Sequence, residues 1–541
     1  MSRYTSYFRK NLSLILFLFL FSVLVISGYI YLNPKEEIET IEVTGRNSNI
    51  NTKMNLGITN YDSMNPHLTK NKDILQIDNL IFEGLFKITN DYNIEPNLIE
   101  EWSKISDTKY LFKIKDNVKW SDGNIITTKD IKFTIDRIKN MNQSIYVNNV
   151  ENILCVEIID DKIFNIVFKE KLPFVEYQLI FPILQEKDFE IKDNINIQNK
   201  KIPTGTGMYK ISKIADNKIE LIVNENYRNI DYEAPKINEI LINIYNNKGE
   251  IYKEFRNDNI DLIETSNSNF TEYIGNIGYN KKEYKNRELE YISFNCNNEI
   301  LCDKNVRKAL NCLINKEEII EELKNKAYIS NFPLDYGSFI LKDFKIKSDN
   351  KDINNEKNNF EVDKEKARKL LNNAGWIFNG DVWEKYGNIL EFEVSVEQEK
   401  KERVLVANII KKQLQQFGIK ITLKELSKLE YENILKKRNY DILLVGVYNG
   451  LSPDLSSFLG DNNLANYKNY NIKKNLLKIN ENNKKELQEL YNNIINIYYD
   501  ELPYINLYRG KSYIIYSKKL IGDITPNSYN FFYNFNKWYK K

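Results

Sequence analysis

The sequence has very little of the chemistry on which enzymes and metalloproteins rely. Its 541 residues include one histidine, His67, and four cysteines, none of them spaced as Cys-x-x-Cys. A histidine-rich metal site is therefore excluded, and a Ser-His-Asp or Cys-His catalytic site would have to use His67. Residues 64–68 read Met-Asn-Pro-His-Leu, which is typical of a turn after a short strand. We expect His67 to be structural, and the protein to be a non-enzyme without metal or cofactor.

The cysteines leave one alternative open. Cys296 and Cys302 flank a short segment and could form a disulfide bond in an oxidising compartment, or both could be free, buried thiols. Their spacing is compatible with either state.

The net charge is small, and nucleotide-binding motifs are absent. The formal net charge is +2, from 77 basic and 75 acidic residues, so nothing in the charge balance favours a nucleic acid as partner. No GxxxxGK[ST] loop is present, which excludes ATP binding by a P-loop. Pairs of acidic residues are frequent, but with 28% charged residues such pairs arise by chance on solvated faces. A surface hydrolase therefore has no specific support.

The sequence does have enough apolar residues, 42%, to build large cores, and its length predicts roughly two to four lobes. It also has one long apolar run, from Leu12 to Leu32, which is long enough to cross a bilayer as a helix. Basic residues precede this run and polar residues follow it. This pattern predicts a cytoplasmic segment at 1–11, a membrane crossing at 12–32 and a linker at 33–53.

The apolar run at 12–32 is longer than the core of a signal peptide, which spans about 7–15 residues, so we favour an uncleaved anchor. A cleaved signal is the alternative, because Val-Ile-Ser at 25–27 offers a small-residue cleavage context. We therefore expect the protein at the cell membrane, crossing it once, with the bulk of the chain on the extracytoplasmic side.

Residues 102–135 carry the most informative pattern in the chain. Tyr110, Phe112 and Ile114 occupy alternate positions, which predicts a strand with one apolar face, extended by residues 118–120. Trp-Ser-Asp-Gly at 120–123 predicts a turn. Thr-Thr-Lys-Asp at 127–130 predicts a capping box that begins a helix. Propensity alone therefore predicts strand, turn and helix.

Further motifs flank this segment in a fixed order. Phe-Glu-Gly-Leu at 82–85 and Pro-x-Leu at 96–98 precede it, and Trp102 is its first residue. The motifs that follow it are Gly-x-Gly-x-Tyr at 205–209, Asn-x-x-Tyr at 224–227, Asn-Ile-Asp-Leu at 259–262, Phe-Asn at 294–295, Val-Arg-Lys-Ala-Leu at 306–310, an amphipathic helix at 363–375, Leu-Gln-Gln-Phe-Gly-Ile-Lys at 414–420 and Tyr-Asp-Ile-Leu at 440–443. Each of them is weak alone.

In this order the motifs resemble those of the family 5 extracellular solute-binding proteins, the receptors of peptide-type ABC importers. The resemblance covers nearly everything after residue 54. It implies an α/β, two-lobed, periplasmic-binding-protein-like fold of type II, with an inserted subdomain and closure by hinge motion. We expect crossings between the lobes near 291–297 and 502–508. The expected parts are lobe 1 at 54–290 with the inserted subdomain at about 83–199, lobe 2 at 291–505, and a C-terminal return to lobe 1 at 506–541.

The resemblance also implies where a ligand would bind. In peptide-binding relatives the ligand backbone pairs with strands of the protein, and a Gly-Trp-x-x-Asp element after the motif at 440–443 supplies an Asp that holds the peptide's amino terminus. Residues 446–450 here are Gly-Val-Tyr-Asn-Gly, with Gly450 at the Asp position and Asp454 the nearest acid downstream. Because a buried ammonium without a carboxylate is costly, either Asp454 takes this role or the ligand lacks a free amino terminus.

The candidate site consists of one residue of the inserted subdomain, five residues after the motif at 440–443, and one at the second crossing. Tyr146, Tyr448, Tyr508 and Val447 could equally be packing residues. The candidate ligand-binding residues are Tyr146, Val447, Tyr448, Asn449, Gly450, Asp454 and Tyr508.

The function implied is that of an extracytoplasmic substrate-binding protein, which captures peptides between two lobes and delivers them to an ABC permease. The permease and ATPase would be separate chains, the N-terminal helix would contact the membrane, and we expect a monomer. The alternative is an anchored receptor of the same fold for another solute, such as a sugar, a metal chelate or a signalling peptide, not coupled to import. Two departures favour the alternative: Gly450, and the absence of any cysteine before Cys155, since relatives are commonly lipidated after the export segment.

Overall fold

The computed structural model describes residues 52–90, 92–189, 203–267, 269–270, 274–275, 278–334, 340, 347–348, 351–352, 362–479 and 484–541. The chain divides into two units, Met1–Ile50 and Asn51–Lys541, and the described residues all belong to the second. The predicted membrane segment at 12–32 therefore lies outside them. Within these ranges, no helix is both long enough and apolar enough to cross a membrane.

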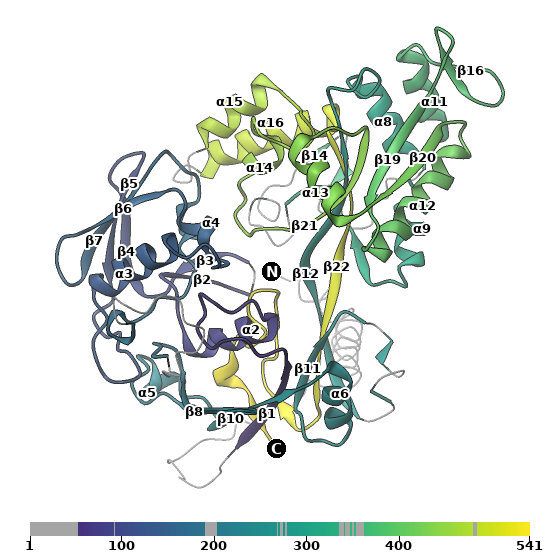
Figure 1. Ribbon diagram of the computed structural model, residues 1–541. Helices are drawn as coiled ribbons and strands as arrows, with labels where there is room; N and C mark the ends of the chain where they lie inside the picture. The colour runs from purple at the N-terminus through teal and green to yellow at the C-terminus, as the bar shows by residue number, and fades with distance from the viewer. Residues whose placement is uncertain are drawn as a thin grey trace, which may run out of the picture. The chain divides into compact units, whose positions relative to one another are not determined.

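One mixed sheet of eleven strands organises the described unit (Figure 1). Its order is β20-β19-β21-β12-β22-β11-β1-β10-β9-β8, and β13 pairs with β22 outside this path. The strands are β1 (Lys53–Thr59), β8 (Tyr209–Ala215), β9 (Lys218–Val223), β10 (Glu239–Tyr245), β11 (Leu262–Thr265), β12 (Tyr279–Phe294), β13 (Ala327–Ile329), β19 (Glu391–Glu397), β20 (Lys420–Leu426), β21 (Ile442–Tyr448) and β22 (Tyr504–Ser517). β1 is parallel to β10 and β11, and β19 is parallel to β20 and β21.

Two long strands, β12 and β22, belong to both halves of this sheet. They span 16 and 14 residues and pair antiparallel with each other. The C-terminal part of β12 also pairs with β21, whereas the C-terminal part of β22 pairs with β11. Their register shifts between Lys285 and Leu289, which is a bulge in β12. The crossings predicted at 291–297 and 502–508 overlap these two strands, and the boundaries of the lobes stay a prediction.

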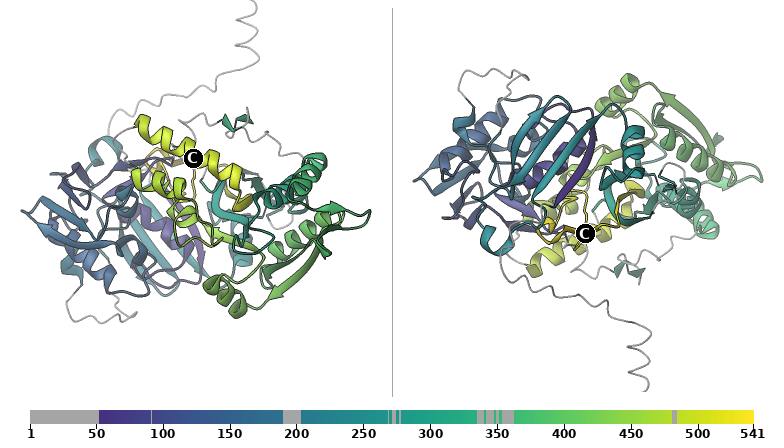
Figure 2. Two further views of the ribbon diagram at one scale, coloured as in Figure 1. Left: turned by 90° about the horizontal axis from the view of Figure 1, so that it is seen from above. Right: turned by 90° about the horizontal axis from the view of Figure 1, so that it is seen from below.

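The first half of the sheet is covered by α2 (Lys72–Ile81) and α6 (Lys248–Arg256). Asn71 begins α2 by accepting hydrogen bonds from the backbone N–H groups of Asp73 and Ile74. Apolar side chains at helical spacing then bury one face of α2. Phe535 and Trp538, from the C-terminus, pack in the same core as Met54. The right-hand view of Figure 2 shows β1, in purple, beside the teal strands with which it pairs.

The second half carries β19–β21 and most of the helices. The helix predicted at 363–375 is confirmed as α11 (Lys364–Asn373), with Asp363 as N-cap and Gly375 at φ +84° after its end. The other helices of this half are α8 (Lys304–Leu313), α9 (Lys316–Glu322), α12 (Lys401–Gln415), α13 (Lys428–Lys437), α14 (Ser456–Leu459), α15 (Tyr470–Lys478) and α16 (Lys484–Glu501).

Residues 99–168 form a separate antiparallel sheet, in the order β4-β5-β7-β6, covered by α3 (Thr128–Lys139). The predicted alternation is confirmed, because Tyr110, Phe112 and Ile114 of β5 are at most 2% exposed. The predicted capping box of Thr127 and Asp130 is also confirmed. The strands of this sheet are β4 (Ile99–Lys104), β5 (Lys109–Ile114), β6 (Ile153–Ile158) and β7 (Ile163–Phe168).

The predicted extension of this strand through residues 118–120 is wrong. β5 ends at Ile114, a turn follows at Asp116, and Lys119 forms only an isolated bridge with Ile125. Gly123, at φ +88°, then closes the turn that Trp120 begins. The sequence Trp-Ser-Asp-Gly is therefore a corner around one fully buried tryptophan.

The remaining elements are short. They are β2 (Phe86–Ile88), β3 (Ile94–Pro96), α4 (Val147–Val150), η1 (Val175–Gln178), η2 (Glu186–Asp188), α5 (Ile230–Glu233), β14 (Lys347–Ser348), β15 (Lys351–Asp352), β16 (Ile377–Phe378), β17 (Trp383–Lys385), β18 (Asn388–Ile389), β23 (Leu520–Ile521), η3 (Phe535–Lys537) and β24 (Tyr539–Lys540).

Candidate ligand-binding site

Four of the predicted site residues, Val447 to Gly450, lie together at the C-terminal end of β21. The apolar run Ile-Leu-Leu-Val at 442–445 forms the buried part of this strand. Val447 pairs with Leu289 of β12 and packs against a neighbouring core, whereas Tyr448 is 56% exposed. The strand therefore anchors the segment in the core and leaves its last residues available for contacts.

A buried ion pair lies directly under this segment. Arg403 of α12 donates two hydrogen bonds of 2.9 Å to the carboxylate of Glu290 of β12, and its third nitrogen lies 3.4 Å from Glu397. A Cβ on Gly446 would come within 2.1 Å of both Glu290 and Arg403. The glycine is therefore required by the close approach of this pair.

Tyr448 joins three elements through its hydroxyl. Lys72, the first residue of α2, donates a hydrogen bond to the Tyr448 hydroxyl, and its Nζ lies 4.7 Å from the ring centroid. The same hydroxyl donates to Glu288 of β12. Burial would lower the pKa of Lys72, but the interactions with Tyr448 and Glu288 outweigh it and raise that pKa. Tyr448 is therefore a polar bridge between α2, which covers the first half of the sheet, and β21, which belongs to the second half.

Asn449 is held by Arg287, a residue in the bulge of β12. The backbone N–H of Asn449 donates to the Arg287 carbonyl at 2.9 Å, and Nε of Arg287 donates to the Asn449 carbonyl at 2.8 Å. The side-chain amide of Asn449 donates to the carbonyl of Pro333. Gly450 follows, and a Cβ there would have no described atom within 4 Å. The backbone is therefore fixed at Asn449 and open at Gly450.

The Asp454 carboxylate is used locally. Its Oδ1 accepts hydrogen bonds from the N–H and the hydroxyl of Ser456, at 2.9 and 2.6 Å, where α14 begins. This is the geometry of an Asx turn next to a helix start. Asp454 acts here as a turn residue rather than as a carboxylate held out towards Gly450.

Tyr146 precedes α4 and is half-buried. Its ring meets that of His67 edge to face at 5.8 Å and lies 6.3 Å from Phe181. Burial raises the pKa of Tyr146, the charge of Asp78 raises it further, and the charge of Arg287 lowers it. Tyr146 therefore lies within electrostatic reach of α2 and of the bulge that holds Asn449.

Tyr508 lies apart from these residues. It is 7% exposed in β22, pairs with Glu290 and Ile329, and belongs to the hydrophobic core with Ile292 and Leu507. Burial raises the pKa of its phenol. The structure gives Tyr508 a packing environment, whereas Tyr146 and Tyr448 have polar neighbours.

His67 is fully buried, and its Nε2 lies 2.7 Å from the carbonyl oxygen of Pro182. Burial lowers its pKa to about 4, so the ring is neutral at neutral pH and Nε2 carries the donated proton. All four cysteines are free, Cys296 and Cys302 included. Among the described residues, no group of three or more His, Cys, Asp or Glu could hold a metal ion.

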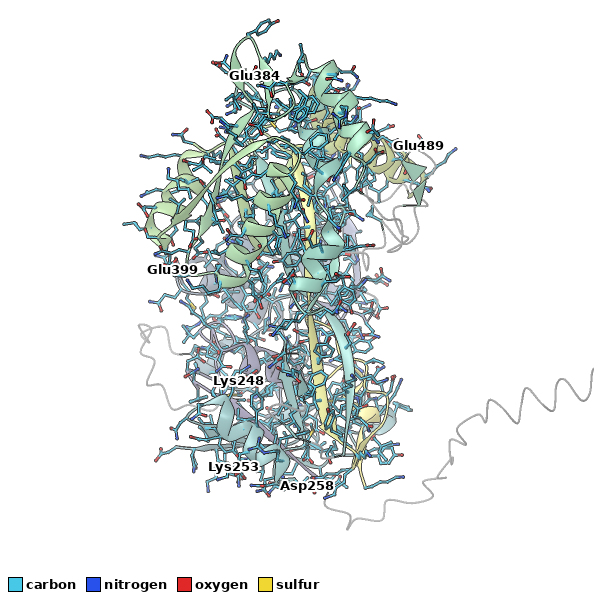
Figure 3. The ribbon with its side chains drawn as sticks, turned by 90° about the vertical axis from the view of Figure 1, so that its right-hand side faces the viewer. Lys248, Lys253, Asp258, Glu384, Glu399 and Glu489 are labelled. Carbon is cyan, nitrogen blue, oxygen red and sulfur yellow. The ribbon has the colours of Figure 1, made fainter. Side chains whose placement is uncertain are left out.

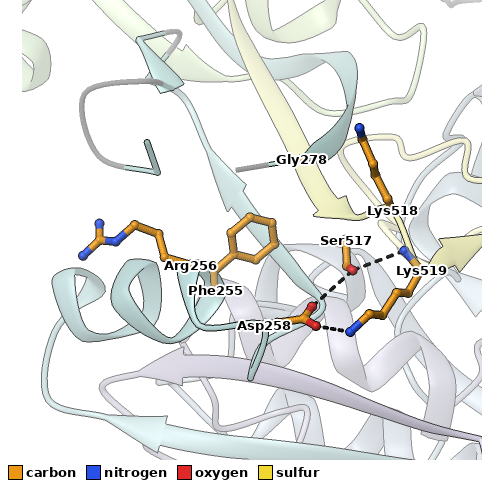
Figure 4. Close-up of a pocket in the computed structure, with 7 residues that line it drawn as sticks. All are labelled: Phe255, Arg256, Asp258, Gly278, Ser517, Lys518 and Lys519. Atoms are coloured by element: carbon orange, nitrogen blue, oxygen red, sulfur yellow. Dashed lines mark hydrogen bonds and ion pairs between the residues drawn. The ribbon is translucent and has the colours of Figure 1, made fainter. Parts of the chain in front are cut away.

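Acidic residues are scattered over the surface. Figure 3 shows Glu384, Glu399 and Glu489 at the periphery and well apart from one another. A cavity of about 250 Å³ lies beside the end of β22, lined by Phe255, Arg256, Asp258, Gly278, Ser517, Lys518 and Lys519 (Figure 4). Lys519 and Ser517 donate to Asp258 there, while the side chain of Arg256 turns away. None of the predicted site residues lines this cavity.

Four polar residues of the site are absent from the predicted set: Lys72, Asp78, Arg287 and Glu288. The spacing of Asp78 could have served as a signal, because it lies on one face of α2 with Ile74, Ile77 and Ile81, and an acid on an apolar face is uncommon. Arg287 and Glu288 carried none, since their position depends on the bulge in β12.

With this geometry established, comparisons with known proteins define the class. A sequence profile of the bacterial extracellular solute-binding proteins, family 5 Middle, matches residues 93–469. The chain belongs to this family, which consists of binding proteins and not of enzymes.

The chain is similar to several members of the class. It is 26% identical over 364 residues to a Brucella ovis protein named as an ABC transporter peptide-binding protein, a match that covers 64% of either chain. It is 24% identical to the oligopeptide-binding protein AppA of Bacillus subtilis, over 86% of this chain and 87% of AppA. The fold is similar to the crystal structure of NikZ from Campylobacter jejuni in complex with Ni(L-His), with a TM-score of 0.63. The two sequences are 25% identical, and the match covers 91% of this chain and 100% of NikZ. The two-lobed α/β fold of periplasmic binding proteins is therefore shown.

Proposed function

We propose that this chain captures peptides between two lobes outside the cell and delivers them to the membrane permease of an ABC importer. The observation that carries the proposal is the bridge at Tyr448, which contacts Lys72 from one half of the sheet and Glu288 of β12. A ligand that touches both lobes binds the closed state better than the open one, which is the condition for ligand-driven closure. Binding and release need no chemistry from the protein itself.

Further contacts between the two halves support closure in this region. Lys171 donates a hydrogen bond of 3.2 Å to the carbonyl of Leu477 in α15. Phe174 and Tyr177, which follow the four-stranded sheet, belong to the same hydrophobic cluster as Ile472 of α15. These contacts bring residues of the proposed inserted subdomain, about 83–199, against the proposed lobe 2, 291–505.

The peptide class is supported by main-chain geometry and by a relative. The backbone after Asn449 is open at Gly450, and an extended peptide binds an open strand end through main-chain hydrogen bonds that tolerate many side chains. AppA of Bacillus subtilis, which aligns with 86% of this chain, is named an oligopeptide-binding protein. The backbone at Asn449 and Gly450 and the similarity to AppA therefore both favour peptide capture.

One observation favours a second candidate, a receptor of the same fold for a non-peptide solute or a signalling peptide that is not coupled to import. Gly450 has no acidic side chain, and the Asp454 carboxylate is occupied by Ser456. NikZ, a structure of the same fold, is in complex with Ni(L-His). A ligand without a free amino terminus would fit residues 446–454 as well as a peptide with one.

The membrane arrangement is part of the proposal. Residues 12–32 would anchor the chain as a single-pass helix, with residues 33–53 as linker and the bulk outside the cell. The permease and ATPase would be separate chains, and the protein would act as a monomer. Mass spectrometry of the mature N-terminus and sedimentation of the detergent-solubilised chain test these points, and a mature N-terminus near Gly28 would contradict the anchor.

The experiment that tests the function uses the full chain in detergent. The protein is incubated with a library of tri- to nonapeptides. Parallel samples receive Ni(L-His) or mono- and disaccharides. Retained molecules are identified by mass spectrometry and their affinities are measured by calorimetry. Retention of peptides alone supports the proposal, whereas retention of the metal chelate or a sugar alone favours the second candidate.

A further inference from the structure

The cavity beside the end of β22 carries more positive than negative charge. Three of its lining residues are basic, Arg256, Lys518 and Lys519, and one is acidic, Asp258. Lys253 adds a further positive charge on the same side of α6, because it precedes Arg256 by three positions. Figure 3 shows Lys253 and Asp258 at the same end of the described unit. Lys253, Arg256, Lys518 and Lys519 are all exposed, and together they are called the basic end below.

The acidic residues of this region compensate only part of the positive charge. Asp258 forms an ion pair with Lys519. Glu254, which follows Lys253, is half-buried and accepts a hydrogen bond of 2.7 Å from a neighbouring asparagine side chain. Among the described residues, no carboxylate pairs with Lys253 or Lys518. The basic end therefore has a local excess of positive charge in a chain whose acidic and basic residues nearly balance.

The directions of these side chains argue against a site for one small anion. In Figure 4, the Lys519 side chain turns to Asp258, whereas those of Arg256 and Lys518 point in different directions. The Ser517 hydroxyl also donates to Asp258, at 3.5 Å, so it is used within the protein. A single phosphate or carboxylate group is bound by donors that converge on it. Positive groups that diverge over an exposed surface instead match a partner surface with many negative charges.

The basic end adjoins the point at which the chain enters the described unit. The backbone N–H of Ser517 donates to the Asp261 carbonyl at 2.9 Å, and the Asp261 carboxylate accepts from the N–H of Asn55 in β1 at 2.7 Å. Lys540, from the C-terminal β24, donates to the same carboxylate at 2.9 Å and to the Lys53 carbonyl at 3.3 Å. The first residues of β1 are therefore held next to the cavity by a connected set of hydrogen bonds.

The chain before β1 limits how far the basic end can move from a membrane. Residues 33–51 separate the predicted membrane segment from the first described residue. Even fully extended, these residues span at most about 65 Å, at about 3.3–3.6 Å per residue. With residues 12–32 as the membrane anchor, the start of β1 therefore stays within this distance of the bilayer. A tether of this length raises the effective concentration of the two surfaces to about the millimolar range, so a weak attraction is sufficient.

We infer that the basic end binds the headgroups of anionic phospholipids, on the extracytoplasmic side of the membrane that anchors the chain. The inference rests on the membrane arrangement given under the proposed function, and it does not involve the ligand. Each lysine or arginine near an anionic bilayer contributes about fivefold in affinity, and salt at physiological strength screens the attraction beyond about 8 Å. Docking is therefore reversible and sensitive to salt. The tether favours lipid over a dissolved polyanion, because it keeps the bilayer close to the basic end.

The test measures how fast individual lysines of the full chain are acetylated, by mass spectrometry, after the chain has been inserted into nanodiscs. The discs contain either phosphatidylcholine alone or phosphatidylcholine with about one third phosphatidylglycerol. We expect Lys253, Lys518 and Lys519 to react at least about threefold more slowly in the anionic discs, because bound headgroups cover their amines. Lys401, an exposed residue at the start of α12, is the internal reference and should react equally in both. Sodium chloride at about 0.5 M should abolish the difference.

Charge reversal tests the assignment to these residues. The variant Lys253→Glu/Lys518→Glu keeps Lys519 as reporter, and the slower reaction of Lys519 in anionic discs should be lost. The matched control is Lys364→Glu/Lys401→Glu, which makes the same change in charge at the first residues of α11 and α12 and should leave Lys519 protected. If the first variant fails to fold, the comparison of lipids and salt on the wild type still decides.

Four results would overturn the inference. They are equal rates in the two kinds of disc, protection that also covers Lys401, protection of Lys519 by inorganic phosphate in neutral discs, and protection that follows the number of protein copies per disc. The third would assign the surface to a single anion and the fourth to a second copy of the chain. A chain that inserts into neither disc contradicts the proposed anchor instead. Co-sedimentation of that chain with vesicles of the same two compositions then tests the basic end alone, and equal binding to both overturns it.

Discussion

The Nζ of Lys72 donates a hydrogen bond to the hydroxyl of Tyr448, across 376 positions of sequence. Lys72 begins α2 beside the first half of the large sheet, and Tyr448 ends β21 in the second half. A second polar contact between the two parts of the chain joins Lys171 to the carbonyl of Leu477. A contact of this kind is formed in a closed arrangement of the lobes and is lost when they separate.

Replacement of Tyr448 by Phe should weaken closure without harming the fold. The variant keeps the ring above which Lys72 lies, but it removes the hydroxyl that Lys72 and Glu288 share. Because Tyr448 is half-exposed, we expect a loss of about 0.5–1 kcal/mol in ligand affinity, which is about 2- to 5-fold in Kd. Calorimetry measures the affinity and small-angle scattering measures the closed fraction. Tyr470→Phe, at an exposed position of α15, is the control, and an unchanged Kd and closed fraction in Tyr448→Phe would contradict the bridge.

Replacement of Gly446 by Ala should destabilise the protein. Its Cβ would come within 2.1 Å of Glu290 and Arg403 and would break their paired hydrogen bonds in a buried place. Loss of a buried charge pair typically costs about 3–5 kcal/mol, and relaxation of the side chains reduces this, so we expect about 2–4 kcal/mol. Urea unfolding measures the difference. Gly450→Ala is the matched control, because it meets no described atom within 4 Å, and equal stability of the two variants would be inconsistent with the close approach.

The contrast between these two glycines shows what sequence could predict. Local signals were sufficient for the strand of Tyr110 and Phe112, for the Thr127–Asp130 capping box and for α11, because each depends on residues a few positions apart. They failed at residues 118–120, where a turn at Asp116 interrupts an apolar pattern. The pair of Arg403 and Glu290 is separated by 113 positions and arises only when the fold brings α12 and β12 together. No local pattern could therefore predict why Gly446 must be glycine.

The candidate site also has a part that the sequence predicted and a part that it could not predict. Motif order pointed to residues 447–450, which the structure brings together at the end of β21. Motif order could not predict that Tyr448 makes polar contacts whereas Tyr508 packs in the core, because both are tyrosines in strands. The partners of Tyr448 and Asn449 come from α2 and from a bulge in β12, and a bulge has no dependable sequence signal.

The His67 imidazole should stay neutral in the folded protein at pH values where a free histidine becomes protonated. Burial lowers its pKa to about 4 from an unfolded value of 6.5, so the folded state resists protonation. Stability is then fully present above pH 6.5 and falls by about 3 kcal/mol as the pH drops from 6.5 to 4. Because the chain has one histidine, the imidazole signal in the NMR spectrum of labelled protein is unambiguous. It should stay constant down to about pH 5, and a midpoint near 6.5 would contradict the buried neutral ring.

Thiol reactivity should distinguish Cys302 from Cys296. Cys302 is exposed, whereas burial raises the pKa of Cys296 from 9.0 to about 11 and leaves about 100-fold less thiolate near neutral pH. A short exposure of the native, non-reduced protein to iodoacetamide should therefore modify Cys302 first and Cys296 only after unfolding. Peptide mapping by mass spectrometry measures both sites, with the urea-unfolded protein as the control for complete labelling. If the two cysteines instead formed a disulfide, neither would be modified, and their joint peptide would be lighter by about the mass of two hydrogens.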